Sequence, residues 1–221
     1  MDLDGDGRLD LVSGSWPGDI YFFRGKGNGA FAAPETLKAH GKPVNVGRAS
    51  AVAVADWDGD GDLDLIVGNI EGGVHLLTNQ GTRQKPAFPG AARLKAANGL
   101  VSAGGGDAGP TVADWDGDGK LDLILGAGNG GVLWYRNTGA PGNPTLAAPV
   151  ALVAAGPATH GRVDNPIRPG TRAKPAVADW NGDGLPDLLL GDFGGASGAY
   201  HGWVWVYLRT QKPTPGEQAR K

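Results

Sequence analysis

Aspartate and glycine recur in a nine-residue pattern whose carboxylates are spaced to bind a cation. In the first copy, residues 2–10, acids stand at positions 1, 3, 5 and 9, and glycines stand at positions 4 and 6. Alternate side chains of a tight loop can direct their oxygen atoms at one point, and position 7 can add its backbone carbonyl. Hard oxygen ligands of this number and charge suit Ca²⁺, whereas Mg²⁺ demands stricter octahedral geometry. The pattern therefore predicts a calcium site.

Four copies of this pattern, called here the Asp loops one to four, occur at residues 2–10, 56–64, 114–122 and 179–187. Their starts are 54, 58 and 65 residues apart. Asn181 lowers the ligand charge of the fourth loop, and Pro186 stiffens it. The first loop begins beside the chain end, at Asp2. We predict up to four bound Ca²⁺ ions, with the fourth site the weakest.

The loops have two alternatives to a propeller-type calcium site. An EF-hand or dockerin loop needs a bidentate Glu at position 12 and flanking helices, but position 12 is Ser13, Val67, Leu125 or Leu190. Asp and Gly also populate ordinary turns. However, three acids within five residues repel one another unless a cation screens them, and this arrangement returns in four similar contexts. The repetition favours calcium.

The segments around the loops have the composition of β-strands. Apolar runs precede the later loops at 51–55, 110–113 and 175–178, and apolar runs follow two of them at 65–68 and 123–126. After a glycine-rich turn come aromatic and β-branched runs at 74–77, 132–135 and 203–207, and then weaker segments at 88–94 and 146–153. The acids comprise 20 Asp and 3 Glu, which excludes a helical bundle. Four strands per repeat, here A to D with the Asp loop between A and B, predict an all-β fold: a β-propeller, or as runner-up a solenoid of hairpins.

We place the blades at about 1–48, 49–107, 108–172 and 173–209, with a polar, Pro-containing tail at 210–221. The first blade has no strand A before its Asp loop, and the last has no strand D after its strand C. We therefore expect an incomplete ring of four repeats, either a piece of a longer propeller or an arc completed by other copies.

The repeated loop with its strand-like flanks resembles the FG-GAP/VCBS repeats of integrin α-chain-like β-propellers over residues 2–209. Phe193-Gly194-Gly195 is the one segment that resembles the family's Phe-Gly element. The resemblance implies a propeller, structural Ca²⁺ and an extracellular or cell-surface setting. The ligands that it implies are side chains at positions 1, 3, 5 and 9 and carbonyls at position 7: Asp2, Asp4, Asp6, Arg8, Asp10; Asp56, Asp58, Asp60, Asp62, Asp64; Asp114, Asp116, Asp118, Lys120, Asp122; Asp179, Asn181, Asp183, Leu185 and Asp187.

Charge and composition exclude several classes of function. A formal net charge of −3 points to no nucleic-acid or membrane partner, and there is no Cys for disulfides or Cys-based zinc sites. No apolar run reaches the roughly 18 residues of a membrane span, and no signal-peptide core is present. Nucleophile-elbow, phosphate-loop and His-Glu-x-x-His motifs are missing. We expect a recognition or assembly module and no catalytic residue. The alternatives are a calcium-assisted polysaccharide lyase, with His160 or His201 as base, and a self-assembling structural arc.

Two further groups of residues are candidates for packing between blades or for ligand binding. Trp57, Trp115 and Trp180 share position 2 of their loops, which predicts packing between blades. The connections between blades carry cations, and turns between strands B and C bring aromatics and His201 to the same face, which could hold an acidic glycan or an anionic protein loop. The alternative is a set of scattered, solvated charges. These residues are His40, Lys42, Arg48, His160, Arg162, Arg168, Arg172 and Lys174, with Trp16, Phe193, Tyr200 and His201.

Overall fold

The computed structural model describes residues 1–155, 170–196 and 199–211, and within them the chain forms only strands, turns and loops. Side chains at 195, 196 and 199–201 are not part of this description. Nowhere in the described residues is there a helix with the length and apolarity needed to cross a bilayer.

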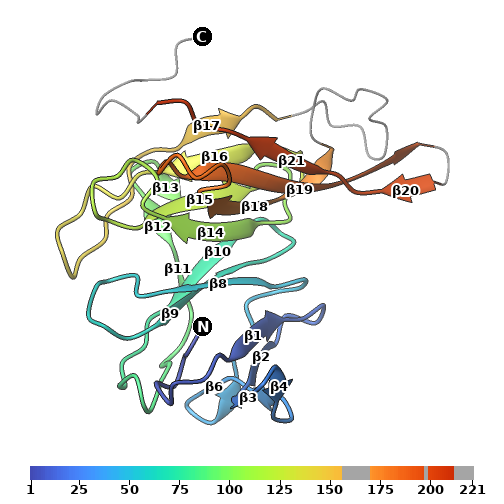
Figure 1. Ribbon diagram of the computed structural model, residues 1–221. Coiled ribbons are helices and arrows are strands. Elements are labelled where there is room, and N and C mark those ends of the chain that lie inside the picture. The colour runs from blue at the N-terminus through green and yellow to red at the C-terminus, as the bar shows by residue number, and fades with distance from the viewer. Residues whose placement is uncertain (156–169, 197–198, 212–221) are drawn as a thin grey trace.

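Four antiparallel sheets follow one another along the chain as blades, and together they form an open arc (Figure 1). Blade 1 has three strands, and blades 2 and 3 have the four strands of the expected repeat. Their strands, in sheet order, are β1 (Leu11–Gly14), β2 (Ile20–Phe23) and β5 (Glu35–Thr36); β8 (Ala51–Ala55), β9 (Asp64–Gly68), β10 (Val74–Leu77) and β11 (Ala92–Arg93); β14 (Gly109–Ala113), β15 (Asp122–Gly126), β16 (Val132–Tyr135) and β17 (Val150–Val153).

Blade 4 consists of β18 (Thr171–Ala178), β19 (Asp187–Ala196) and β21 (Val204–Tyr207). Its strand β19 runs beyond the sheet and pairs with β20 (Ala199–His201), so that the two project as a hairpin (Figure 1). Three short hairpins complete the description: β3 (Gly25–Gly27) with β4 (Ala30–Phe31), β6 (Lys38–Ala39) with β7 (Lys42–Pro43), and β12 (Lys95–Ala96) with β13 (Gly99–Leu100).

Strands A, B and C form close to where the sequence predicts them, and the two predicted strand D segments each contain a shorter strand, β11 and β17. The apolar run 51–55 is β8, and the aromatic run 132–135 is β16. The segment 88–94 contributes only the two residues of β11. In blade 1, the corresponding strand β5 also has two residues. Outer strands of a blade are exposed on one edge, so their sequence carries little of the apolar pattern that marks the inner strands.

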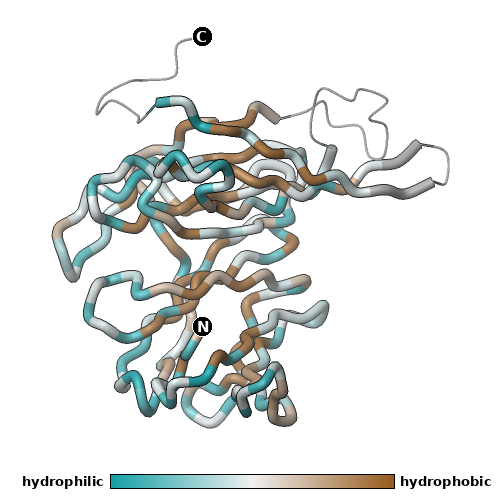
Figure 2. Tube along the Cα trace, in the orientation of Figure 1, coloured by the Kyte–Doolittle hydropathy of each residue, from teal (hydrophilic) through white to brown (hydrophobic). Residues whose placement is uncertain are grey.

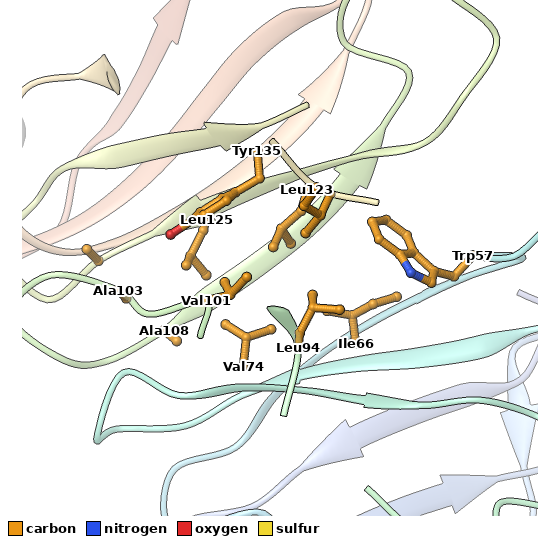
Figure 3. Packing of buried hydrophobic residues seen from close by; sticks show 12 residues of the cluster. Trp57, Ile66, Val74, Leu94, Val101, Ala103, Ala108, Leu123, Leu125 and Tyr135 are labelled. Atoms are coloured by element: carbon orange, nitrogen blue, oxygen red, sulfur yellow. The ribbon is translucent and has the colours of Figure 1, made fainter. Parts of the chain in front are cut away.

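The core lies between the blades, in three clusters of buried side chains. Strand β9 contributes to two of them, because successive residues of a strand point to opposite faces. Leu65 and Val67 pack toward blade 1, whereas Ile66 packs with Leu123 and Leu125 of blade 3 (Figure 3). The inner strands are therefore apolar on both faces, and they form the hydrophobic stripes of the molecule (Figure 2).

A glycine at the end of strand B lets neighbouring blades approach closely. A Cβ atom at Gly68 would overlap the backbone carbonyl of Ala108 in blade 3, and one at Gly126 would overlap that of Ala173 in blade 4. Gly14 lies in the same way against the carbonyl of Ser50 in blade 2. Each blade interface thus has the next blade's backbone seated on a glycine.

Two of the three loop tryptophans pack between blades, as predicted. Trp57 belongs to the cluster between blades 2 and 3, and Trp115 to the cluster between blades 3 and 4. Trp180 differs, since 61% of its surface is exposed. The sequence predicts the wrong environment for Trp180, because none of the blades formed by the described residues packs against the outer face of blade 4.

Candidate metal centres in the Asp loops

Asp loops two to four connect the first two strands of their blades, and loop one leads into β1. In loop two, Gly59 and Gly61 have φ angles of 79° and 95°. The glycines at positions 4 and 6 of the other loops also have positive φ. Residues with a Cβ atom rarely adopt this conformation. The two glycines are therefore required by the backbone that turns the acids inward.

Backbone amides of each loop bind the carboxylates that surround them. In loop three, Asp114 accepts hydrogen bonds from the amides of Gly117, Asp118 and Gly119 at 2.8, 3.0 and 2.9 Å. The amide of Lys120 donates to Asp118 at 3.0 Å. Loop four repeats these bonds around Asp179 and Asp183. Such side-chain to backbone bonds replace the strand ladder and hold the loop closed.

The closed loops bring carboxylates together. Among the described residues, three groups of acids place one oxygen each within 4.8 Å of the others: Asp2, Asp4 and Asp10; Asp56, Asp58 and Asp60; Asp114, Asp116 and Asp118. Loop four forms no such group of three acids, because Asn181 replaces the acid at position 3. Burial, followed by the negative charge of Asp60, raises the pKa of Asp58.

The acid at position 9 is placed differently from the acids at the loop tip. Asp64 is 1% exposed, and it accepts the amide of Trp57 at 3.1 Å and the amide of Asn79, beyond β10, at 2.7 Å. Asp122 accepts the amides of Trp115 and Asn137 in the same way. Burial raises the pKa of both carboxyls to about 6. This carboxylate ties the loop to the end of strand C.

The sequence analysis did not predict these hydrogen bonds, although the acid that accepts them recurs at position 9 of every repeat. Position 9 of loops one and four makes the same two bonds: Asp10 with the amides of Leu3 and Gly25, and Asp187 with those of Trp180 and Arg209. The acceptor and both donors therefore lie at fixed places in all four repeats.

Sequence reasoning also missed two arginines at the loops. Arg24, at the end of β2, pairs with Asp4, and Arg136, after β16, pairs with Asp116 and with Asp118 at 3.2 Å. The residue at the same place in blade 2 is Thr78, directly before Asn79. Loop two therefore has no arginine from this position to balance its acids.

The oxygen-rich loops fit a hard divalent cation. Within the described residues, Oδ1 of Asp56 is buried and has no hydrogen-bond partner. An unpaired buried carboxylate oxygen is costly unless a cation neutralises it. Carboxylate and carbonyl oxygens are the donor set that Ca²⁺ takes in proteins. Loop two thus has the oxygen ligands that Ca²⁺ prefers, and one of these oxygens, Oδ1 of Asp56, has no hydrogen-bond partner.

Part of the predicted cationic face gathers at one cavity. Trp16, Arg172, Lys174 and Phe193 line a cavity with a volume of about 580 Å³. Asp107 also lines it and pairs with Lys174 Nζ at 3.0 Å and with Arg172 Nε at 3.5 Å. The guanidinium of Arg172 lies 5.7 Å from the ring centre of Phe193. The cavity therefore combines exposed aromatics with two partly balanced cations.

The other residues of that predicted face are placed elsewhere or not described. Arg48 pairs with Glu71 at 3.5 Å, and His40 and Lys42 lie in the turn and second strand of the β6–β7 hairpin, outside the lining of the cavity. His160, Arg162 and Arg168 fall outside the described residues, and for Tyr200 and His201 only the backbone, in β20, is described.

Two solved structures are similar to this chain. The chain is similar to a lectin from Agrocybe aegerita, whose structure concerns specific recognition of non-reducing terminal N-acetylglucosamine, with a TM-score of 0.51, 24% identity, and coverage of 92% of this chain and 50% of the lectin. It is also similar to the Tc holotoxin pore of Photorhabdus luminescens, with a TM-score of 0.49, 24% identity, and coverage of 96% and 9%. The chain thus spans half of the lectin chain and under a tenth of the toxin chain.

The sequence itself matches a family of repeats. A family model described as an FG-GAP-like repeat matches residues 2–67, 56–125 and 114–190. Each match starts at position 1 of one Asp loop and ends in the strand after the next loop. No curated protein matches the chain. Because the three matches together cover residues 2–190, the protein belongs to the FG-GAP-like repeat family.

Proposed function

We propose that the chain is a calcium-stabilised β-propeller module that serves recognition or assembly outside the cell. The observation that carries the proposal is that the same glycine-hinged loop returns in every blade and gathers three carboxylates in each of blades 1 to 3. Up to four Ca²⁺ ions would be held by the acids at positions 1, 3, 5 and 9 with the carbonyl at position 7, and by Asn181 at position 3 of loop four. A bound ion would join strands A and B at the edge of each blade.

Metal binding of this kind is coupled to folding, because the unfolded chain does not hold the ligands together. At 100 times the Kd, one site contributes about 2.7 kcal/mol to the free energy of unfolding. For a domain of this size that corresponds to a rise in Tm on the order of 5 to 10 °C. An extracellular setting suits the proposal, since Ca²⁺ modules there bind with Kd of about 10⁻⁴ to 10⁻³ M.

The test is a calcium titration of the purified chain, with Tm measured in Ca²⁺ and in EDTA. Asp58→Asn removes a proposed ligand of loop two and is expected to weaken calcium binding there about tenfold. Asp62→Asn is the matched control, because it removes the same charge from the same loop while its proposed ligand, the backbone carbonyl, stays. Equal effects of the two substitutions, or a Tm that EDTA leaves unmoved, would contradict the proposal.

We place ligand recognition at the cavity lined by Trp16, Arg172, Lys174 and Phe193. Its exposed indole and two cations suit an acidic glycan or an acidic protein segment. With a heparin oligosaccharide as the probe, calorimetry should detect binding that Trp16→Ala and Arg172→Ala each weaken. Lys95→Ala, which removes an exposed cation from β12, outside the lining of the cavity, should leave the affinity unchanged. Equal losses of affinity for the Lys95 and Arg172 variants would mean that the oligosaccharide responds only to the overall surface charge.

A further inference from the structure

A second cavity lies between blades 1 and 2, and it shares no lining residue with the cavity at Trp16. Its volume is about 620 Å³, within the range of roughly 300 to 1,000 Å³ that is usual for small-molecule sites. We propose that it binds a small molecule that carries a planar aromatic ring and a carboxylate. The proposal goes beyond the calcium sites and the recognition of glycans or proteins, and it depends on neither.

The cavity is lined by Leu3, which stands at position 2 of its Asp loop, where loop two has Trp57. Both residues donate their amide to the position-9 acid of their loop, Leu3 to Asp10 at 2.8 Å and Trp57 to Asp64 at 3.1 Å. Trp57 packs in the cluster between blades 2 and 3 (Figure 3), whereas Leu3, although buried, belongs to none of the clusters that the described residues form. The shorter side chain therefore reaches this boundary without filling it.

One wall of the cavity has a counterpart beside that tryptophan. The amide of Leu37, which lines the cavity, donates to the carbonyl of Ile20 in β2 at 2.8 Å. In the same way, the amide of Leu94 donates to the carbonyl of Val74 in β10 at 2.9 Å. Leu94 shares a buried cluster with Trp57. The two leucines thus hold the same place in successive blades, one beside the cavity and the other beside an indole ring.

The opposite wall comes from the next blade along the chain and repeats the comparison. Phe88 of blade 2 lines the cavity, and Leu146 of blade 3 shares the cluster of Trp57. The residue before each, Ala87 or Thr145, accepts a backbone amide at 2.8 Å in the same connection between strands C and D. The surroundings that hold an indole at one boundary are therefore present at the other, where a cavity remains.

Aromatic side chains in the walls favour an aromatic occupant. Phe22 in β2 and Phe88 both line the cavity and are 9% and 5% exposed. Aromatic rings pack well in offset or edge-to-face arrangements against a second ring. A planar group that enters beside Leu3 would meet both phenyl rings and the side chain of Leu37. The cavity thus offers apolar and aromatic surface where the next boundary holds a bicyclic ring.

The charged side chains of the lining explain why the ligand should be an anion. Arg24, Lys38 and Lys85 line the cavity and are exposed, against the two acids Asp4 and Glu35. Asp4 is buried and paired with Arg24. None of the ion pairs formed by the described residues includes Lys38, Lys85 or Glu35, so two unpaired lysines face one unpaired acid. An exposed carboxylate on a buried ring would be bound by these ammonium groups.

The test is calorimetry with indole-3-acetate, with indole and acetate as the two partial probes. The chain should bind indole-3-acetate at one site and more tightly than either partial probe, because different parts of the lining hold the ring and the carboxylate. Leu3→Trp places in the cavity the side chain that packs at the next boundary. This substitution should abolish binding of indole-3-acetate and raise Tm by about 2 to 5 °C, as filling a cavity does.

A second variant tests the charge without altering the packed walls. Lys38→Ala should weaken binding of indole-3-acetate about fivefold and leave the binding of indole unchanged. Lys95→Ala is the matched control, because Lys95 begins β12 as Lys38 begins β6 and lies outside the lining. This control should change neither affinity.

Four results would overturn the proposal. Indole-3-acetate fails to bind, the folded Leu3→Trp variant binds it as tightly as the original chain, or the substitutions of Lys38 and Lys95 weaken binding equally. The fourth is binding of N-acetylglucosamine, but not of indole-3-acetate, that Leu3→Trp abolishes, which would make the cavity a site for a neutral sugar. Each titration is made in Ca²⁺ and in EDTA, so that failure of the proposed calcium sites, seen as an unchanged Tm, remains distinguishable from failure of this cavity.

Discussion

The aspartates of these loops form two different sets of hydrogen bonds, depending on their position in the loop. The acids at positions 1, 3 and 5 close the loop tip around themselves, as Asp114 and Asp118 do with their neighbouring amides. Asp122, at position 9, is fully buried and binds amides from two separate segments. The acids of one loop therefore differ in what they hold together: those at the tip close the loop itself, and the acid at position 9 also connects it to the end of strand C.

At this scale we predict that Arg136 competes with calcium in loop three. Its guanidinium pairs with Asp116 and Asp118, and removing one charge at about 4 Å changes an exposed interaction by about 1 kcal/mol, or about fivefold in Kd. Arg136→Gln should tighten calcium binding by that factor. The loop-three component is identified calorimetrically as the one that Asp116→Asn abolishes. Arg48→Gln is the control, and tighter binding in that variant would attribute the effect to net charge alone.

Within each blade, the carboxylate at position 9 connects the Asp loop to the end of strand C, a connection that the hydrogen bonds between strands do not make. Asp122 lies at the start of β15, accepts the amide of Asn137 beyond β16, and also accepts the indole Nε1 of Trp134 at 2.9 Å. Strands A, B and C of a blade are thus tied at the loop edge by hydrogen bonds to one buried charge, which are stronger than neutral ones.

We predict that this tie stabilises the blade without any metal. In EDTA, Asp122→Ala leaves three buried donors without their acceptor and should lower the free energy of unfolding by about 3 kcal/mol or more. Asp60→Ala, at an exposed loop tip, should change it by less than about 1 kcal/mol. Urea denaturation measures both. Similar losses for the two variants would show that position 9 has no special structural role.

For the whole molecule, calcium would reverse the sign of the net charge. The formal charge is −3, and four divalent ions would bring it to +5. At pH 7 and low salt, where surface charges are weakly screened, the chain should leave an anion exchanger earlier in Ca²⁺ than in EDTA. The shift should be smaller for Asp58→Asn if loop two then stays empty. Identical elution in both conditions would contradict the filling of the loops.

Much of this architecture could be predicted from the sequence, because the repeat presents the same information several times. The loops and the inner strands, such as β8 and β16, follow directly from it. What could not be predicted depends on contacts between segments. The pairing of Arg136 with loop three needs the end of β16 beside that loop, and the exposure of Trp180 depends on which segments pack beside blade 4, which the local sequence does not reveal.

The glycine at each blade boundary has a consequence for how such a protein can evolve. Gly14, Gly68 and Gly126 receive successive blades by the same backbone contact, so each boundary accepts any unit that follows the same rule. Duplicating or deleting one gene segment of repeat length would therefore create one new boundary of a kind already present. The chain can therefore lengthen or shorten by whole blades during evolution. Amino-acid changes within a blade remain constrained by the two blades that contact it.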